Sequence, residues 1–194
     1  MASQGSGVGV ELLEVASELG ALTFGEFVLA SGAKSSYYFD GRLLTLSPRG
    51  AELAARALLP AIRASGATAV GGPAVGAVPL VTEIALLSGL DGGAPVSGFF
   101  VRKEAKDHGL GKALEGPAPA GARVAVVDDV CSTAGSLYLA IRAAEEEGYE
   151  VALVGCILDR RQGGSERLRS EGYAFAAALE ADAEGNIAPA GQAG

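Results

Sequence analysis

Two adjacent carboxylates, Asp128 and Asp129, follow the apolar run at residues 124–127, and a series of small residues comes directly after them. That series is Val130, Cys131, Ser132, Thr133, Ala134, Gly135 and Ser136. Small side chains allow several backbone N–H groups to converge on one point, and a helix that begins there adds its partial positive charge. The pattern predicts a phosphate-binding loop, which is not a Walker loop because the GK[ST] lysine is absent.

The acidic pair predicts a second binding function beside that loop. Carboxylates repel a phosphate, but they bind a sugar diol or a hydrated magnesium ion that bridges to another phosphate. A ligand that combines a phosphate, a diol and a metal-bound diphosphate is a phosphoribosyl diphosphate. We therefore expect Mg²⁺ as the cofactor, held near Asp128 and Asp129 through the diphosphate and water, with no direct protein ligand.

A helix N-cap is the competing interpretation, because Ser, Thr and Asp are common where a helix begins. For Ser136 alone the cap is the favoured interpretation. A cap needs only one such residue, however, and it gives no reason for two carboxylates. Ligand binding is therefore the better interpretation of the block as a whole.

A second group of chemically capable side chains lies at residues 102–109, where this acidic chain concentrates positive charge. Its members are Arg102, Lys103, Lys106 and His108, the only histidine of the chain. Gly109 and Gly111 make the segment pliable. A solvated turn is the ordinary interpretation of a charge run, but this one leaves an expected strand on the side where ligands bind. We expect a cationic lid that closes over a leaving diphosphate and excludes water.

The elements that position these residues alternate between short apolar strands and helices. Strands are expected at residues 68–72, 96–101, 123–127, 151–158 and 173–179, and helices at residues 10–19, 48–62, 75–87, 135–147 and 166–171. Strands that are apolar on both faces and separated by helices indicate a parallel sheet covered on both sides. The sequence predicts a doubly wound α/β fold with a mostly parallel sheet, in which ligands bind at the carboxyl ends of the strands.

We expect a single domain, residues 1–194, with three parts. Residues 1–45 form an N-terminal helix and a hood of short strands and turns, and residues 46–181 form the α/β core. Residues 182–194 are rich in Gly, Ala and Pro and are expected to form a flexible tail.

Composition narrows the classes of function. The chain has 194 residues with 15 basic and 23 acidic side chains, a net charge of −8, so it is a poor general binder of nucleic acid or anionic lipid. No apolar run reaches the ~18–20 residues that span a bilayer. The two cysteines, Cys131 and Cys156, support neither a disulfide framework nor a zinc site. We expect a cytoplasmic protein without nucleic-acid or membrane partners.

Several motifs resemble those of a known family. The block at residues 128–136 resembles the signature of type I phosphoribosyltransferases, with Ala134 where many members have Gly. The stretch R-K-E-x-K-x-H-G at residues 102–109 is similar to the catalytic loop of orotate phosphoribosyltransferases. Residues 27–40 are similar to their motif F-x-L-x-S-G-x-x-S-x-x-Y-x-D, and residues 158–161 to their L-D-R segment.

The resemblance implies a phosphoribosyltransferase that transfers the phosphoribosyl group from its diphosphate to orotate, giving orotidine 5′-monophosphate and diphosphate for pyrimidine biosynthesis. It also implies a homodimer in which the basic loop reaches the neighbouring subunit. Residues 128–136 would hold the ribose hydroxyls and the 5′-phosphate. The implied diphosphate ligands are Arg102, Lys103, Lys106 and His108; the implied catalytic residues are Lys106, His108, Asp128 and Asp129; and the implied orotate ligands are Tyr38, Phe39, Ser132 and Arg160.

Two positions depart from the family pattern. Ala30 stands where many members have a lysine before the Ser-Gly pair, and Val75 and Gly76 occupy a loop that carries another lysine. Both lysines would contact the diphosphate. Their absence predicts weaker substrate binding unless Lys34 and the basic loop compensate.

Two alternatives stay open at this stage. One is a transferase of the same fold that acts on a purine or another base. The other is a non-catalytic protein that binds the same ligand and regulates transcription, although neither the net charge nor a helix-turn-helix pattern supports a nucleic-acid surface.

Overall fold

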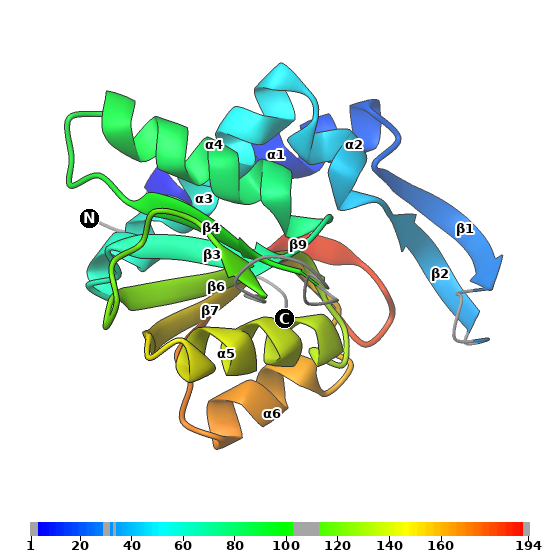
Figure 1. Ribbon diagram of the computed structural model, residues 1–194. Helices are drawn as coiled ribbons and strands as arrows, with labels where there is room; N and C mark the ends of the chain where they lie inside the picture. The colour runs from blue at the N-terminus through cyan, green and yellow to red at the C-terminus, as the bar shows by residue number, and fades with distance from the viewer. Residues whose placement is uncertain (1–3, 29–31, 33, 103–112, 192–194) are drawn as a thin grey trace.

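The computed structural model describes residues 4–28, 32, 34–102 and 113–191. Over these residues, a seven-stranded sheet lies between helices on its two faces, and a two-stranded hairpin extends from one end (Figure 1). The strands of the sheet are β3 (Ala69–Pro73), β4 (Ser97–Val101), β5 (Leu114–Glu115), β6 (Arg123–Cys131), β7 (Glu150–Asp159), β8 (Phe175–Ala181) and β9 (Ile187–Pro189). The helices are α1 (Gln4–Glu18), α2 (Gly41–Thr45), α3 (Pro48–Ala64), α4 (Ala77–Leu90), α5 (Gly135–Glu146) and α6 (Gly164–Ser170). The predicted α/β fold with a mostly parallel sheet is confirmed.

The order of strands across the sheet is β5-β4-β3-β6-β7-β8-β9. The inner strands β4, β3, β6, β7 and β8 pair in parallel, while β5 and β9 pair antiparallel at the edges. From β3 the chain proceeds to β4 on one side, and from β6 it proceeds to β7 on the other. Ligands bind at such a switch point, beyond the carboxyl ends of the strands. The topology therefore brings together the loops that follow β3 and β6.

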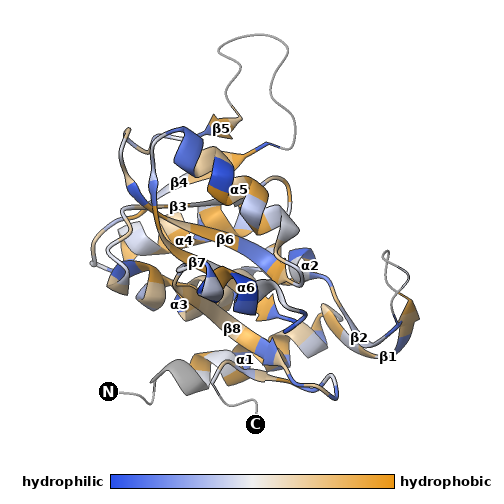
Figure 2. Cartoon of the chain, turned by 90° about the horizontal axis from the view of Figure 1, so that it is seen from below, coloured by the Kyte–Doolittle hydropathy of each residue, from blue (hydrophilic) through white to orange (hydrophobic). Residues whose placement is uncertain are grey.

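Alternating side chains along β6 serve two hydrophobic cores. Ala125 and Val127 pack into the core formed with α3 and α4, and Val124 and Val126 pack into the core formed with α5. All four are fully buried. In Figure 2 the central strands are mainly orange, and α5 and α6 carry blue segments. Burial of a strand on both faces explains its continuous apolar sequence.

Two glycines allow close packing at the carboxyl end of β3. A Cβ at Gly71 would lie 2.2 Å from the Phe99 ring, and a Cβ at Gly72 would lie 2.0 Å from the backbone oxygen of Val127. The end of β3 can therefore approach β6 closely, and this is the region in which the candidate site lies.

The N-terminal elements cover one end of the core. Helix α1 packs against α3 and β9, and strands β1 (Leu22–Val28) and β2 (Lys34–Phe39) form an antiparallel hairpin. The hairpin extends away from the sheet in Figure 1. Asp40 caps the short helix α2 by accepting a hydrogen bond from the backbone N–H of Arg42.

Strand β6 is longer than predicted. The expected strand ends at residue 127, but β6 continues through the acidic pair to Cys131 because it pairs with β7 as far as the partners Cys131 and Asp159. Asp128 and Asp129 therefore lie within the carboxyl-terminal part of the strand itself.

The prediction that residues 182–194 form a flexible tail is wrong for its described part. Asp182 closes a turn by accepting hydrogen bonds from the backbone N–H groups of Glu184 and Asn186. Strand β9 then pairs with β8, with Ile187 and Pro189 buried. The Gly/Ala/Pro composition hid this short strand, because only two of its apolar side chains reach the core.

The helix α2 and the strand β5 were not predicted, because elements of five and two residues carry no measurable periodicity. No helix in the described ranges has the length and apolar character needed to cross a membrane.

Candidate active site

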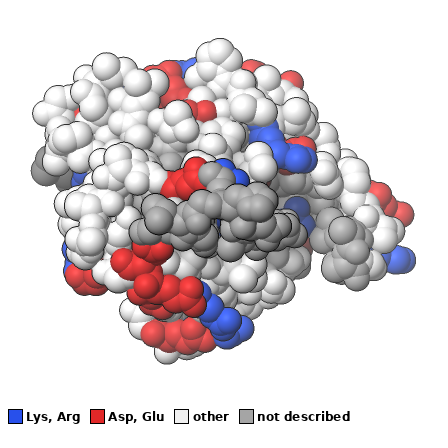
Figure 3. All heavy atoms as spheres, in the orientation of Figure 1, with Lys and Arg blue, Asp and Glu red and all other residues white. Residues whose placement is uncertain are grey.

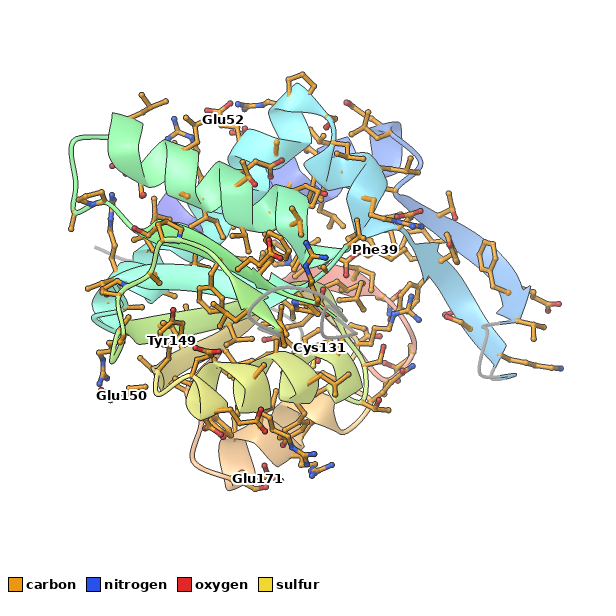
Figure 4. The ribbon with its side chains drawn as sticks, in the orientation of Figure 1. Phe39, Glu52, Cys131, Tyr149, Glu150 and Glu171 are labelled. Atoms are coloured by element: carbon orange, nitrogen blue, oxygen red, sulfur yellow. The ribbon has the colours of Figure 1, made fainter. Side chains whose placement is uncertain are left out.

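A cavity of about 460 Å³ lies at the switch point between β3 and β6. This volume is within the range of small-molecule sites. Its lining residues come from three segments that are far apart in the sequence: Tyr38, Phe39, Asp40 and Arg42; Ala74, Val75 and Gly76; and Asp129. In Figure 4, Phe39 and Cys131 lie toward the hairpin, on the side where β6 ends, whereas Tyr149 and Glu150 lie on the opposite side, where β7 begins. The cavity therefore lies at the carboxyl ends of the central strands.

The acidic pair is largely removed from water. The Asp128 side chain is buried, and its two oxygens accept hydrogen bonds from Ser136 Oγ (2.7 Å) and from the backbone N–H of Asp129 (3.0 Å). Burial raises the pKa of both carboxyls, and the charge of Asp129 raises the pKa of Asp128 further. A hydroxyl-bearing ligand or a cation would compensate for the lost hydration.

Asp129 is held against the start of α2. A Cβ on Gly41 would lie 2.5 Å from the Cβ of Asp129, so only glycine fits at this position. Arg42 lowers the pKa of Asp129 and Asp40 raises it, although both effects are smaller than that of burial. The segment at residues 40–42 therefore belongs to the site, which the sequence analysis missed.

The small-residue loop connects β6 to α5. Val130 and Cys131 are the last residues of β6, and Gly135 is the first residue of α5. Ser132 is half-buried, while Thr133 and Ser136 are exposed. No side chain caps α5, so its first N–H groups are available to a ligand.

Ala134 adopts the left-handed conformation, with φ 63°, at the N-cap of α5. This conformation costs a residue with a side chain about 1 kcal/mol, which explains why glycine suits the position. The loop is braced from outside, because Gly164 donates its backbone N–H to the oxygen of Ser132 (3.0 Å). A Cβ on Gly164 would lie 2.5 Å from that oxygen.

Arg160 forms no ion pair with an acidic side chain within the described residues. Its guanidinium lies over the Tyr37 ring, 5.2 Å from the centroid, and its buried Nε makes no hydrogen bond within the described ranges. The neighbouring Arg161 instead pairs with Glu180 (2.7 Å). Arg160 is thus oriented by an aromatic ring and available to an anion.

The structure brings together only part of the predicted site. Tyr38, Phe39 and Asp129 line the cavity, but Ser132 and Arg160 do not. Arg102 pairs with Glu115 (2.8 Å). Lys103, Lys106 and His108 lie outside the described residues, as does Ala30.

The pair formed by Asp40 and Arg42 lines the cavity and was missed by sequence reasoning. Asp40 belongs to the recognised motif and Arg42 follows it closely, so an acid and a cation two residues apart were the available signal. Asp40 Oδ1 accepts a hydrogen bond from Arg42 Nε (2.9 Å), and its Oδ2 accepts one from Nη2 (2.8 Å).

The donor set at this edge suits magnesium that keeps most of its water. Within the described ranges, no group of three or more His, Cys, Asp or Glu side chains could form a metal cage. Two adjacent carboxylates, Asp128 and Asp129, do provide the hard oxygen atoms that hydrated Mg²⁺ prefers.

Comparison with known proteins gives a consistent result. The family model described as phosphoribosyl transferase domain matches residues 47–176. The orotate phosphoribosyltransferase of Rhodopirellula baltica is 44% identical over 161 residues, which is 80% of this chain and 83% of the relative. The crystal structure of the Mycobacterium tuberculosis orotate phosphoribosyltransferase with Fe(III) dicitrate has a TM-score of 0.78, with 34% identity over 89% of this chain and 96% of that chain. That enzyme in complex with 5-phospho-α-D-ribosyl 1-diphosphate has a TM-score of 0.71, with 31% identity and the same coverage.

The replacement Asp128→Asn is expected to stabilise the fold at pH 8. Because the pKa of Asp128 is raised, its contribution to stability is full below the unfolded value near 3.8 and is lost as the pH rises through the folded value. Asparagine can still accept from the Asp129 N–H and can donate to Ser136 Oγ. We expect the melting temperature to rise by a few degrees at pH 8, measured by calorimetry with a chelator present, and the gain to disappear near pH 4.

Asp91→Asn is the control of opposite sign. Its hydrogen bond with Arg63 lowers the pKa of Asp91 to about 2, so the charged form stabilises the fold above the unfolded value. This variant should lower the melting temperature at pH 8. A loss of stability in Asp128→Asn at pH 8 would contradict the burial argument.

Proposed function

This chain belongs to the phosphoribosyltransferase family, among its orotate phosphoribosyltransferases, and we propose that its reaction takes place at the cavity between β3 and β6. It transfers the phosphoribosyl group from phosphoribosyl diphosphate to orotate, which gives orotidine 5′-monophosphate and diphosphate in pyrimidine biosynthesis. The observation that carries the placement is the convergence of Asp129, the loop after β3 and the motif at residues 38–40 on one cavity.

The acidic pair binds the ribose in this proposal. Asp128 and Asp129 accept hydrogen bonds from the ribose hydroxyls, which replace the water that the buried carboxylates have lost. The 5′-phosphate binds to the loop at residues 132–136, where the uncapped N-terminus of α5 and the hydroxyl of the exposed Thr133 are available. Both ends of the sugar are then fixed by one strand and the helix that follows it.

The cationic side chains stabilise the leaving diphosphate. The bond between C1 and the diphosphate oxygen breaks as C1 bonds to a ring nitrogen of orotate, and the sugar passes through an oxocarbenium-like state. Lys103, Lys106 and His108 neutralise the developing charge, and Arg102 joins them by leaving Glu115. Magnesium, held by the diphosphate and water near the acidic pair, would supply further positive charge.

Orotate binds beside the hairpin. Tyr38 and Phe39 form one wall of the cavity, and Ser132 hydrogen-bonds the base. Arg160 pairs with the carboxylate of orotate, because a planar guanidinium fits a carboxylate with two hydrogen bonds. Its position over Tyr37 and its unbonded Nε support this role.

A homodimer is also part of the proposal, with the basic loop reaching the neighbouring site. Helix α4 exposes Leu86 (62%) and Leu90 (75%), and Val75 (76%) precedes it. Leu43 in the adjacent α2 is also exposed, as is Leu46, which directly follows that helix. The surface over α4 is mainly white in Figure 3, which means that few charges lie there. A second copy of the chain would cover this apolar face.

Glu83 is the one charged residue in α4. Burial raises its pKa to about 8, and its Oε2 has no hydrogen-bond partner within the described residues. At neutral pH the side chain is largely uncharged, which is compatible with an apolar interface.

The two cysteines are free and buried, and we propose a cytoplasmic location.

Orotate consumption tests the function directly. Absorbance should fall when the protein is mixed with orotate, phosphoribosyl diphosphate and Mg²⁺, and a chelator should abolish the change. Guanine and adenine serve as control bases. Diphosphate release with guanine but none with orotate would overturn the assignment.

Lys106→Ala tests the basic loop. Loss of one cation that stabilises the leaving group is expected to lower kcat by ~100-fold or more, with the melting temperature unchanged. Lys106→Arg, which keeps the charge, should recover part of the rate. Equal loss of activity and of stability in Lys106→Ala would count against a role in the reaction.

Leu86→Glu tests the dimer. A charge in the apolar face of α4 should convert the dimer to monomer in sedimentation analysis and lower activity, because each site loses the partner's basic loop. Leu139→Glu is the matched control, since Leu139 is 59% exposed on α5, on the other face of the sheet. A wild-type monomer, or a Leu86→Glu dimer, would refute this interface.

A further inference from the structure

We propose that Arg42 binds the diphosphate of phosphoribosyl diphosphate and supplies the positive charge that the loop after β3 lacks. This inference rests on the proposed function, and it assigns a role to a residue outside the motifs described above. Three observations support it: the charges that line the cavity, the way in which Asp40 holds the guanidinium, and the uncapped start of α4.

The charges in the cavity wall require a cation for an anionic ligand. Among the lining residues, Asp40 and Asp129 carry carboxyl groups, and Arg42 is the only cation. Gly76 lies in the same wall and has no side chain to contribute. A diphosphate that enters this cavity is repelled by both acids. Among the described lining residues, Arg42 alone carries a positive charge that can balance it.

Asp40 fixes the direction of the Arg42 guanidinium. The Asp40 carboxylate accepts hydrogen bonds from Nε and Nη2 of Arg42, while Nη1 of Arg42 makes no hydrogen bond within the described ranges. Asp40 also accepts from the backbone N–H of Arg42 (3.0 Å), so the pair is tied to the first turn of α2. The Arg42 side chain is 60% exposed. A long side chain that is already oriented loses less conformational entropy when it binds a ligand.

The start of α4 indicates which end of the substrate lies here. Gly76 is the N-cap of α4 and forms no side-chain cap hydrogen bond. In the first turn Val78 already donates its N–H to the backbone oxygen of Val75, and Pro79 has no N–H, so the helix dipole is what favours an anion at this wall. Orotate lies against Tyr38 and Phe39 in the same cavity, but its carboxylate is assigned to Arg160, which lies outside the cavity lining. The diphosphate is therefore the group that Arg42 contacts.

Steady-state kinetics of Arg42→Ala tests this role. Loss of one charged hydrogen bond predicts a ~10- to 100-fold higher KM for phosphoribosyl diphosphate, with the KM for orotate changed less than about twofold. Arg42→Lys should fall between wild type and Arg42→Ala. Arg56→Ala is the matched control, because Arg56 is also exposed and paired with a carboxylate, Glu52, but lies on α3 away from the cavity.

Asp40→Asn gives a second variant that retains the cation. It removes a carboxylate charge that repels the diphosphate, while its amide oxygen can still cap α2, so the KM for phosphoribosyl diphosphate should stay at or below that of wild type. An unchanged KM for phosphoribosyl diphosphate in Arg42→Ala, or an equal rise for both substrates, would overturn the assignment.

Calorimetric binding of magnesium pyrophosphate separates this inference from the proposed function. Binding to the Arg42→Ala protein should weaken by ~10-fold or more, while binding to Arg56→Ala should match that of wild type. This difference would support the inference even if orotate were not consumed. Equal affinity in all three proteins would refute it, whatever the activity with orotate.

Discussion

The burial of two neighbouring carboxyl groups at the end of a central strand is the constraint on which the site depends. Asp128 and Asp129 lie where β6 continues along β7 to Cys131, beyond its pairing with β3, which ends at Val126. Hydrogen bonds from Ser136 Oγ and from a backbone N–H offset only part of this cost. In the proposed function, ribose hydroxyls and a hydrated cation compensate for the remaining cost, so the protein would give up stability in its free state and gain selectivity for a ligand that carries both.

Small residues allow three distant segments to meet at this pair. Gly72 lets β3 approach Val127, Gly41 lets α2 begin against Asp129, and Gly164 lets the start of α6 support the loop at residues 132–134. At each position a Cβ would lie within 2.5 Å of an atom that cannot move far. The surroundings of the acidic pair are therefore closely packed, which suits the proposed reaction, in which the protein positions two substrates rather than forming a bond to either.

The sequence predicted the alternation of elements and the acidic pair because both leave strong local signals. Strands buried on both faces are continuously apolar, and two carboxylates before a small-residue loop are rare. The contact of Gly41 with Asp129 depends on tertiary packing across about 90 residues, which no local pattern contains. The pair of Asp40 and Arg42 is local, but two residues alone do not show that they line a cavity. Strand β9 was missed for a related reason: its two buried side chains, Ile187 and Pro189, form too short a pattern. The ion pair of Arg102 with Glu115 depends on β5, an edge strand of two residues.

A chain with a net charge of −8 must bind a polyanion through local positive charge. Among the described cations near the site, Arg42 and Arg102 each pair with a carboxylate, that of Asp40 and that of Glu115. Arg160 lies over the Tyr37 ring instead. A neutral partner such as Tyr37 leaves the charge of Arg160 fully available, whereas an acid such as Asp40 orients Arg42 but reduces its net field. A cation oriented by a neutral ring, such as Arg160, suits a tightly bound carboxylate. A cation oriented by an acid, such as Arg42, suits a diphosphate that must also leave. Because Arg42 is shared with Asp40, it binds the product less strongly than an unpaired cation would.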